Sequence, residues 1–554
     1  MKKRSASDFL SLLSTISVSN EPEDPDDTHK GSEKAVELEN EFILNLPSIN
    51  FDGKPITFKA WFNSNDHDFT KPRQALKMYQ HEEKMILSDS DVIPSETPTL
   101  NKLINSKKNM EILSNEYAPS IFDYRDFFYV GENFEDYRKI AALKVVNHIY
   151  DDMYEKKNRE SPDARDSSYT MSSVLVICPT RKQAYEFINE IISVLPENDP
   201  NSGEPFVVQN FDRFNEEYSV GEVPQFILKT KPKDWLRTFG GNNSNEFRMG
   251  IRFFDNKIKL FNSMEKSQLI IGSSLSLFLH EDKDFMSSIE VLVLDSLDVL
   301  MAQQGDRLLQ LILMLNKLPQ KVNATDWGHL RLYCTDKQQE KLRQNIIYSS
   351  VLTPEMHNMF SKFPNIRGQL IVRPLKYPPL LIPGLDRSFK KLECQNVKQI
   401  GTALEKCFDE KLYPLIKQWR SEPEETAKRT IIYYVSSYRF YQARKKLETN
   451  MVNFLELSDE ATKEDSKRMK KAFNDDPNAV LLVTERFYFH FRPKFRDVQR
   501  VVFIQPPTFP QFVPELAGNC SAIFYFTEFD EIAIERIVGS ELSHSILSHD
   551  FYTL

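Results

Sequence analysis

From about residue 120 onward, short runs of hydrophobic residues alternate with longer segments that have helical spacing. In the N-terminal half the runs lie at 174–177, 267–272, 291–295 and 330–333, and the helical segments at 137–154, 183–195 and 306–318. Strands that are apolar on both faces are typical of parallel sheets covered by helices on both sides. The pattern therefore predicts an α/β fold.

The same rhythm restarts after a proline-rich segment, residues 374–383. Proline cannot donate a hydrogen bond to a sheet and indicates a connector. Beyond it, strands are predicted at 429–435, 480–484 and 500–504, and a helix at 439–447. We therefore expect two lobes, and we divide the chain into an acidic tail (1–50), an extension of uncertain order (51–115), lobe 1 (116–373), a hinge (374–388) and a basic lobe 2 (389–554).

Charge is distributed unevenly along the chain. Residues 1–50 hold five Lys/Arg against ten Asp/Glu without apolar periodicity, which predicts a disordered tail. Residues 361–500 hold 28 Lys/Arg against 18 Asp/Glu, although the whole chain has a formal charge of −9. This excess of positive charge indicates either a polyanionic or acidic partner or simply a solvated surface.

Cysteine usage and hydropathy exclude several classes of protein. The chain has five cysteines and no C-x-x-C spacing, which argues against a disulfide scaffold and against a zinc site made of cysteine pairs. Neither a secretory signal nor an apolar run of the roughly 18–20 residues that span a membrane is visible. We expect a reducing, intracellular setting.

In open α/β sheets, ligands bind beyond the carboxyl ends of the strands. These ends carry Pro179-Thr180-Arg181, Gly272-Ser273-Ser274, Asp295-Ser296-Leu297-Asp298, Arg343 to Ser350, Thr484-Glu485-Arg486 and Pro506-Pro507-Thr508. This ordered series resembles the DEAD-box RNA helicases. The resemblance implies two RecA-like lobes with parallel sheets, an RNA-backbone contact at Pro179-Thr180-Arg181, and an altered acidic motif at Asp295, Ser296 and Asp298.

The groups that hydrolyse ATP in such helicases are missing. No G-x-x-x-x-G-K-[ST] phosphate loop occurs, and residues 156–165, where we place that loop, contain no glycine. Ser296 stands where a glutamate would orient water, and no His-Arg-x-x-x-Arg motif lies near 514–518. Asp295 and Asp298 more readily cap or hydrogen-bond backbone than hold magnesium. We therefore predict no ATP turnover, no cofactor and no metal.

Several further stretches resemble one family, the digestive organ expansion factor family. They are Phe239 to Gly250, Val293 to Val299, Arg343-Gln344, Asn365 to Gln369 and Thr484 to Phe489. The resemblance implies a nucleolar, nuclear protein of the small-subunit processome that acts with U3 small nucleolar RNA and pre-rRNA in early 18S rRNA processing. Two departures are the Ser296-Leu297 pair within the acidic motif and a short acidic N-terminal region.

Candidate contacts to RNA or to processome proteins are basic residues at strand ends and in a basic-aromatic segment, together with the Pro-Thr pair. They are Pro179, Thr180, Arg181, Arg248, Arg343, Arg486, Arg492, Lys494 and Arg496. We call residues 487–496 the basic-aromatic segment. Alternation on a strand would place its aromatics Phe487, Tyr488, Phe489 and Phe491 either in the core or against bases. Arg181 could equally pair with a local carboxylate.

Three functions remain open from the residues. The first is a non-catalytic scaffold that binds pre-rRNA, U3 small nucleolar RNA and processome proteins. The second is an RNA-dependent ATPase with a reorganised site, and the third is a protein-interaction module without RNA contact. For the first function we expect neither a membrane nor a small-molecule substrate.

Overall fold

A computed structural model describes most of the chain beyond residue 106. The described residues are 76–80, 107–113, 115–132, 135–157, 161, 163–198, 203, 205–321, 327–381 and 385–553. The predicted acidic tail, residues 1–50, lies outside them, as does most of the predicted extension. In this part of the chain, no helix is both long and apolar enough to cross a membrane.

Lobe 1 is built on a ten-stranded sheet in the order β1-β10-β2-β9-β8-β3-β7-β5-β6-β4. All neighbouring strands are parallel except β5, which runs antiparallel to β6 and β7. The strands are β1 (Leu76–Gln80), β2 (Asp126–Val130), β3 (Val174–Ile177), β4 (Val207–Gln209), β5 (Arg248–Phe253), β6 (Lys257–Asn262), β7 (Leu269–Gly272), β8 (Val291–Leu294), β9 (Gln344–Ser349) and β10 (Gln369–Arg373). Edge strand β1 comes from the predicted extension.

Helices cover both faces of this sheet, because side chains alternate along each buried strand. Val174 and Val176 pack under α7 (Glu135–Lys157) and α8 (Arg181–Val194), whereas Leu175 and Ile177 pack under α12 (Ser274–Leu279), α13 (Leu297–Met314) and α15 (Pro354–Ser361). The remaining α-helices of this lobe are α5 (Lys107–Leu113), α6 (Ala118–Phe122), α9 (Phe211–Tyr218), α10 (Gln225–Thr230), α11 (Lys233–Phe239) and α14 (Leu332–Thr335).

Lobe 2 has a seven-stranded sheet in the order β13-β14-β12-β15-β16-β11-β17. Only the β11–β17 pair is antiparallel. The strands are β11 (Arg387–Lys391), β12 (Thr430–Tyr434), β13 (Leu455–Leu457), β14 (Val480–Thr484), β15 (Arg500–Ile504), β16 (Ser521–Phe526) and β17 (Phe551–Thr553). Its α-helices are α16 (Ile400–Cys407), α17 (Tyr413–Arg420), α18 (Ser437–Thr449), α19 (Lys463–Asp475), α20 (Glu485–Phe491), α21 (Phe512–Ala517), α22 (Glu531–Val538) and α23 (Ser540–Leu547).

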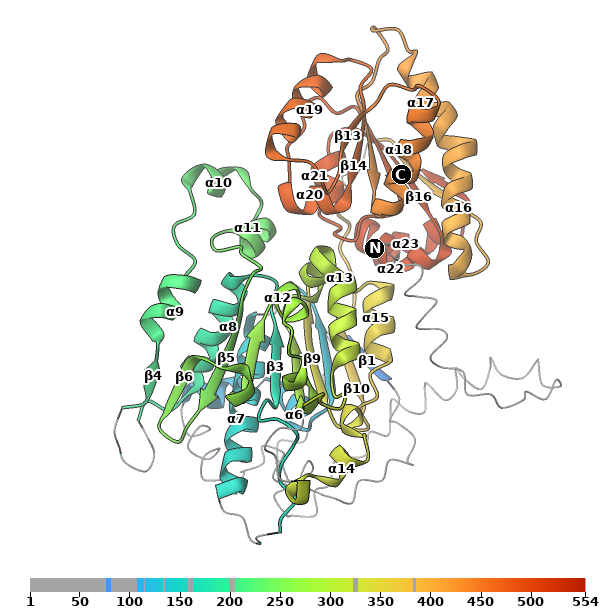
Figure 1. Cartoon of the computed structure of the whole chain (residues 1–554). Helices are drawn as coiled ribbons and strands as arrows, with labels where there is room; N and C mark the ends of the chain where they lie inside the picture. The colour runs from blue at the N-terminus through green and yellow to red at the C-terminus, as the bar shows by residue number, and fades with distance from the viewer. Residues whose placement is uncertain are drawn as a thin grey trace, which may run out of the picture.

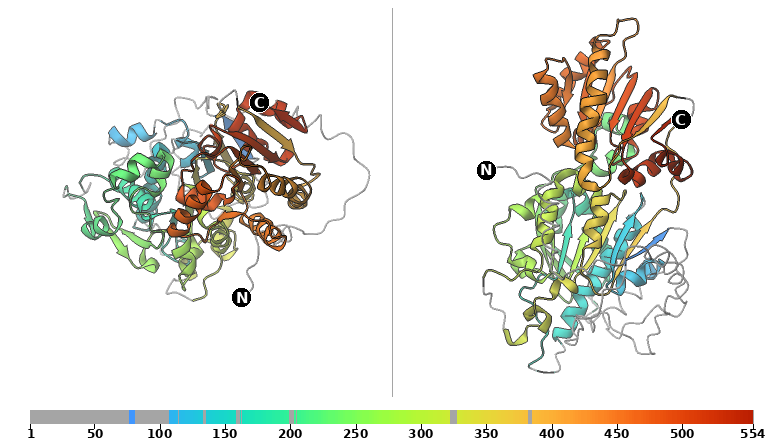
Figure 2. Two further views of the ribbon diagram at one scale, coloured as in Figure 1. Left: turned by 90° about the horizontal axis from the view of Figure 1, so that it is seen from above. Right: turned by 90° about the vertical axis from the view of Figure 1, so that its right-hand side faces the viewer.

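The two lobes lie one above the other (Figures 1 and 2). The connector after β10 packs on lobe 2: the backbone N–H of Tyr377 donates to the hydroxyl of Ser540, and that of Leu380 to the carbonyl of Ile537. The expected architecture, two α/β lobes with mostly parallel sheets, is confirmed.

Three local elements differ from what the sequence pattern indicates. Residues 330–333 are not a strand: Leu330 makes an isolated bridge to Ser167 and helix α14 follows, because the side chain of Arg331 is drawn into a buried polar network. The helix predicted at 306–318 begins earlier, at Leu297, and is kinked at Gln304. The segment from Phe487 is helix α20, since the Thr484 hydroxyl accepts from the N–H of Phe487 and caps it.

Candidate functional site at the junction of the lobes

The carboxyl ends of the central strands of lobe 1 meet lobe 2. Asp295, directly after β8, is fully buried there. Arg138, in the first turn of α7, donates to both of its carboxylate oxygens, from Nε at 2.9 Å and from Nη2 at 3.3 Å. The Nη1 of Arg138 donates to Glu186 of α8 at 2.8 Å. One guanidinium thus bridges two carboxylates at the end of the sheet.

The electrostatics favour this arrangement. Burial lowers the pKa of Arg138, but the two carboxylates outweigh it and hold that pKa above its usual value. Burial also raises the pKa of Glu186, although Arg138 and Lys182 oppose the shift. A charge-assisted bidentate pair of this kind is among the strongest hydrogen-bonded contacts in proteins. The cation that neutralises Asp295 is therefore the guanidinium of Arg138.

The position assigned to a phosphate loop must be corrected. In a strand–loop–helix unit the loop lies between the strand and the start of the helix. Here that unit is β2, residues 131–134 and α7, whereas residue 157 lies at the opposite end of α7, roughly 28 Å from Arg138 at 1.5 Å per residue. Residues 131–134 contain glycine only at position 131 and neither lysine, serine nor threonine.

Ser296 and Asp298 make contacts within lobe 1. Ser296 has a left-handed φ of 59°, and its hydroxyl donates to Asp295 at 3.2 Å. The carboxylate of Asp298 accepts from the hydroxyl of Ser350, which follows β9, and burial raises the pKa of Asp298. These residues therefore tie together the ends of neighbouring strands.

The residues at this place do not fit a magnesium–nucleotide complex. Both oxygens of Asp295 are already hydrogen-bonded, and Arg138 stands where a cation would have to lie. The cleft between the lobes leaves about 20 Å³ here, about the room of one water molecule. Over the described ranges, no group of three or more His, Cys, Asp or Glu side chains could hold a metal ion.

The Pro179-Thr180-Arg181 segment is covered by other parts of lobe 1. Thr180 is fully buried, and its hydroxyl donates to the side-chain carbonyl of Gln183. Arg181 donates to the carbonyls of Glu217 at 3.2 Å and Glu246 at 3.1 Å. These contacts leave this segment little surface for the RNA backbone.

Helix α11 connects the lobes, and we call α10, α11 and the residues between them (225–239) the arm (Figure 1). The indole N–H of Trp235 donates to the carbonyl of His490 at 2.9 Å. Asp234 pairs at 2.5 Å with Arg492, which also pairs with Glu515 at 2.7 Å. The arm of lobe 1 is therefore bound to α20 and α21 of lobe 2 by charged and neutral hydrogen bonds.

Apolar packing reinforces this junction. Phe239 of the arm lies edge-on against Phe489 of lobe 2, with the ring centroids 5.3 Å apart. Phe239, Val299 and Val351, all from lobe 1, belong to the same buried hydrophobic cluster as the core of lobe 2. The lobes thus share a core.

Two family profiles match the chain. One, described as "UTP25, NTP hydrolase-like domain", matches residues 124–370, and the other, "Utp25, C-terminal domain", matches residues 380–553. The chain belongs to the UTP25 family. This confirms the family resemblance expected from the sequence.

Relatives with curated names agree with this assignment. U3 small nucleolar RNA-associated protein 25 of Schizosaccharomyces pombe is 28% identical over 461 residues, which cover 76% of this chain and 68% of that protein. Protein NUCLEOLAR FACTOR 1 of Arabidopsis thaliana is 27% identical, with 81% and 65% covered, and the human U3 small nucleolar RNA-associated protein 25 homolog is 25% identical, with 76% and 60% covered. The chain spans about two thirds of the length of these relatives.

Among solved structures, the chain is similar to DEAD-box helicases. The helicase Mss116 bound to single-stranded RNA and UDP-BeF has a TM-score of 0.30 at 13% identity, covering 85% of this chain and 80% of that one. A DEAD box protein from Methanococcus jannaschii has a TM-score of 0.25 at 10% identity, covering 82% of this chain and 94% of that one.

Two glycines of the UTP25-like block at 239–250 have steric roles. Gly241 has a φ of +109°, and a Cβ there would lie 2.3 Å from Val220. At Gly250 a Cβ would lie 2.6 Å from the carbonyl oxygen of Asn262. Arg248, in the same block, is exposed and lines a groove of about 430 Å³ beside β6 and α12.

Other family motifs form a buried network around Asp126, at the start of β2. Its carboxylate accepts from the side-chain amides of Asn345 and Asn365, both at 2.9 Å, and of Gln369 at 3.3 Å. Burial raises the pKa of Asp126 to about 6 despite these donors. Arg343 is buried beside this network and donates to Asn345 at 3.0 Å, so it offers no exposed group to RNA.

The remaining candidates lie in lobe 2. Arg486 donates to the carbonyl of Gln303 in lobe 1 at 2.6 Å, and Arg492 is buried in the junction described above. Lys494 and Arg496, in the loop after α20, are exposed. The basic-aromatic segment thus divides into a buried part and an exposed part, with Phe487, Tyr488 and Phe489 in the core.

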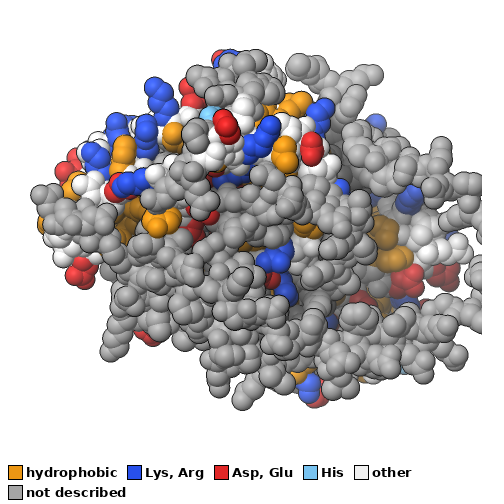
Figure 3. Space-filling view, turned by 90° about the horizontal axis from the view of Figure 1, so that it is seen from below, with side chains coloured by type: hydrophobic (Ala, Val, Ile, Leu, Met, Phe, Trp, Pro, Cys, Tyr) orange, Lys and Arg blue, Asp and Glu red, His pale blue; other side chains and the backbone are white. Residues whose placement is uncertain are grey.

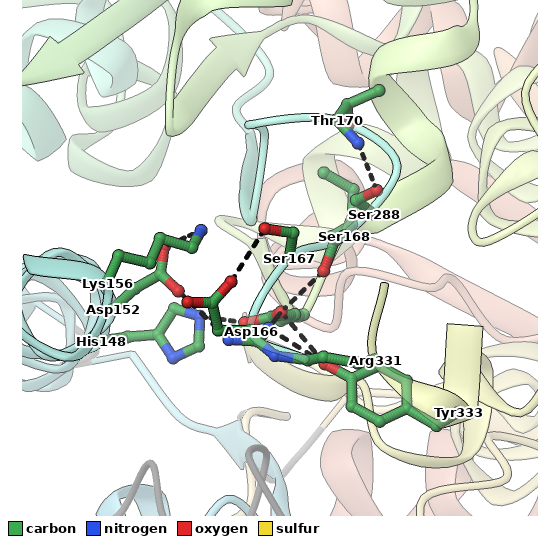
Figure 4. A network of polar contacts seen from close by, with 12 residues as sticks. His148, Asp152, Lys156, Asp166, Ser167, Ser168, Thr170, Ser288, Arg331 and Tyr333 are labelled. Atoms are coloured by element: carbon green, nitrogen blue, oxygen red, sulfur yellow. Dashed lines mark hydrogen bonds and ion pairs between the residues drawn. The ribbon is translucent and has the colours of Figure 1, made fainter. Parts of the chain in front are cut away.

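A second buried network lies at the opposite end of lobe 1 (Figure 4). Arg331, only 1% exposed, pairs with Glu290 at 2.6 Å and with Asp152 at 3.2 Å. The Nε2 of His148 lies 2.9 Å from Glu290, and its Nδ1 lies 2.7 Å from the hydroxyl of Tyr124. The network joins α7, the segment before β8 and the segment before α14.

Sequence reasoning missed Arg138, Asp126 and the arm. Arg138 lies inside a helix with ordinary helical spacing, and Asp126 opens a strand, so neither position carries a motif. The arm could have been suspected from Trp235 and Phe239 beside the family block, because large aromatics next to charged residues often anchor interfaces.

Proposed function

We propose that this chain is a non-catalytic, helicase-like component of the nucleolar machinery that assembles the small ribosomal subunit. It would act with U3 small nucleolar RNA and pre-rRNA in early 18S rRNA processing, bound to other processome proteins. Membership of the UTP25 family supports this proposal, since its curated relatives carry the name U3 small nucleolar RNA-associated protein 25.

The observation that carries the non-catalytic part is the Arg138–Asp295 pair. Phosphoryl transfer in helicase-type enzymes needs a metal ion bridging the phosphates and a base that orients water. Here a guanidinium replaces the cation at Asp295, and a serine hydroxyl follows that carboxylate. Phe239, Val299 and Val351 of lobe 1 pack in the core of lobe 2, and this apolar contact would hold the lobes together independently of ATP.

Purification of the tagged full-length protein after ultraviolet crosslinking in cells, with sequencing of the attached RNA, tests the functional assignment. We expect U3 and pre-rRNA sequences to be enriched over an untagged control, and an Asp295→Asn variant to recover the same RNAs. Failure to recover either RNA would contradict the proposal.

The other two functions make different predictions. A reorganised RNA-dependent ATPase, suggested by Asp295 and Asp298, would release phosphate at a rate that rises with RNA and vanishes in Asp295→Ala. A protein-interaction module without RNA contact would bring down processome proteins but no crosslinked RNA within residues 361–500.

A further inference from the structure

Lysines from both lobes converge where the arm meets lobe 2. Lys231, between α10 and α11, inserts its ammonium against lobe 2, where it donates to the carbonyl of Phe491 and, at 3.3 Å, to that of Arg492. Lys470 of α19 and Lys494, after α20, lie close enough to act on its charge. Positive charge from lobe 1 is therefore held beside positive charge from lobe 2.

The electrostatics of this cluster are unfavourable in the free protein. Burial and the charges of Lys470, Arg492 and Lys494 together lower the pKa of Lys231 to about 8. Arg492 is neutralised by Asp234 and Glu515. Among the residues that the structure describes, no carboxylate forms an ion pair with Lys470, Lys494 or Arg496. A bound polyanion would relieve the repulsion between these cations.

Aromatic rings accompany the lysines. The ammonium of Lys470 lies 6.0 Å from the centre of the Phe495 ring, and that of Lys231 lies 5.0 Å from the Trp235 ring. Phe226, on α10, is 67% exposed and lies near the exposed Lys229 in the same helix. Lysines for phosphates together with rings for bases are the usual means of binding single-stranded nucleic acid.

Other surfaces have a different character. The face seen from below in Figure 3 intersperses Lys/Arg with Asp/Glu and hydrophobic side chains over its described part. The groove beside Arg248 also contains Glu265 and Asp282. Both therefore present charges of both signs.

We propose that Lys231, Lys470, Lys494 and Arg496 form a binding surface for the backbone of single-stranded RNA, which we call the composite basic surface. It is built from both lobes, which the contacts of Trp235 and Asp234 in the arm hold together. The proposal deepens the function proposed above by naming where RNA is bound, and it rests on that function.

Fluorescence anisotropy of a labelled oligouridine with the full-length protein, over a range of salt concentrations, tests this surface. In the triple variant K470Q/K494Q/R496Q we expect at least a tenfold loss of affinity. The slope of log affinity against log salt should fall by about two, at roughly 0.7 per lost phosphate contact. A matched variant that neutralises exposed lysines elsewhere on lobe 2, K398Q/K406Q/K445Q, should bind as the wild type does.

A separate variant tests whether RNA binding depends on the contact between the arm and lobe 2. A Trp235→Ala variant, which loosens the arm, should lose affinity several-fold although it removes no cation, and added ATP–magnesium should leave the wild-type affinity unchanged. If the triple variant binds oligouridine as tightly as the wild type does, the composite basic surface is contradicted while the proposed function stands. Binding of polyglutamate but not of oligouridine, lost in the triple variant, would overturn it in favour of an acidic protein segment. Absence of U3 RNA from crosslinked complexes would instead contradict the proposed function.

Discussion

The two ends of the lobe 1 sheet are organised around the same kind of contact. At one end Arg331 joins Glu290 and Asp152, and at the other Arg138 joins Asp295 and Glu186. The first set is almost fully buried, whereas the side chain of Glu186 is 34% exposed at the edge of the cleft between the lobes. The end of the sheet that faces lobe 2 is thus built as an ion-pair network, like the opposite end.

The largest effect is expected at the fully buried network. In Arg331→Met the buried Glu290 and Asp152 keep His148 and Lys156 as basic partners but lose their shared guanidinium, which should cost about 3–5 kcal/mol of unfolding free energy. Urea unfolding followed by circular dichroism measures this loss. The surface pair Lys321–Asp282 provides the control, because Lys321 is exposed and Lys321→Gln should leave the unfolding free energy nearly unchanged. Equal effects of the two substitutions would contradict the comparison.

A smaller loss, about 2–4 kcal/mol, is expected for Arg138→Met, because Glu186 can regain water while Asp295 cannot. The double variant R138M/D295N removes both members of the buried pair and should recover part of that stability. Unfolding midpoints of the wild type, the single variant and the double variant measure this coupling. An Arg138→Met protein as stable as the wild type would show that the pair has no structural role.

The junction between the lobes should respond to Trp235→Ala. This change removes a partly buried ring and its hydrogen bond to His490, at a cost of about 2–3 kcal/mol in lobe docking. Small-angle X-ray scattering should show a larger radius of gyration, and hydrogen exchange should increase in α20 while the core strand β8 stays protected. Unchanged scattering would mean that the shared core alone holds the lobes.

The smallest effect concerns Glu485, at the start of α20. Burial raises its pKa to about 7, although the N–H of Thr508 and the hydroxyl of Tyr433 donate to it. Between the ordinary glutamate value of 4.5 and about 7 the folded chain keeps a proton that the unfolded chain releases, so this group makes stability fall as pH rises through that window. Glu485→Gln keeps an acceptor and should lessen the decline, leaving the variant about 1–2 kcal/mol more stable at pH 8. Parallel stability profiles from pH 5 to 8 would contradict this assignment.

Much of the fold could be predicted because both lobes use continuous apolar strands. Runs such as Val174–Ile177 and Val480–Thr484 are strands in the structure, as expected. The alternation of apolar and polar residues at 330–333 predicts a strand, but four residues are too few to distinguish a strand from a turn that buries its arginine. In the basic-aromatic segment, the alternation is compatible with a strand, but the Thr484 hydroxyl accepts from the N–H of Phe487 and caps a helix.

The candidate site was predictable in part. Reading the strand ends located Asp295 and Asp298, but the partners of these residues come from distant segments: Arg138 precedes Asp295 by 157 residues. A sequence pattern does not reveal such pairings, because they depend on how the strands are ordered in the sheet. Arg492 illustrates the same point, since its partner Asp234 belongs to the other lobe.

The central claim is that the chain's own guanidinium has replaced the metal and nucleotide at Asp295. Calorimetric titration of the full-length protein with ATP–magnesium, with and without RNA, tests it most directly. The account predicts no binding heat up to millimolar nucleotide. Submillimolar affinity that is lost in Asp295→Ala would contradict it.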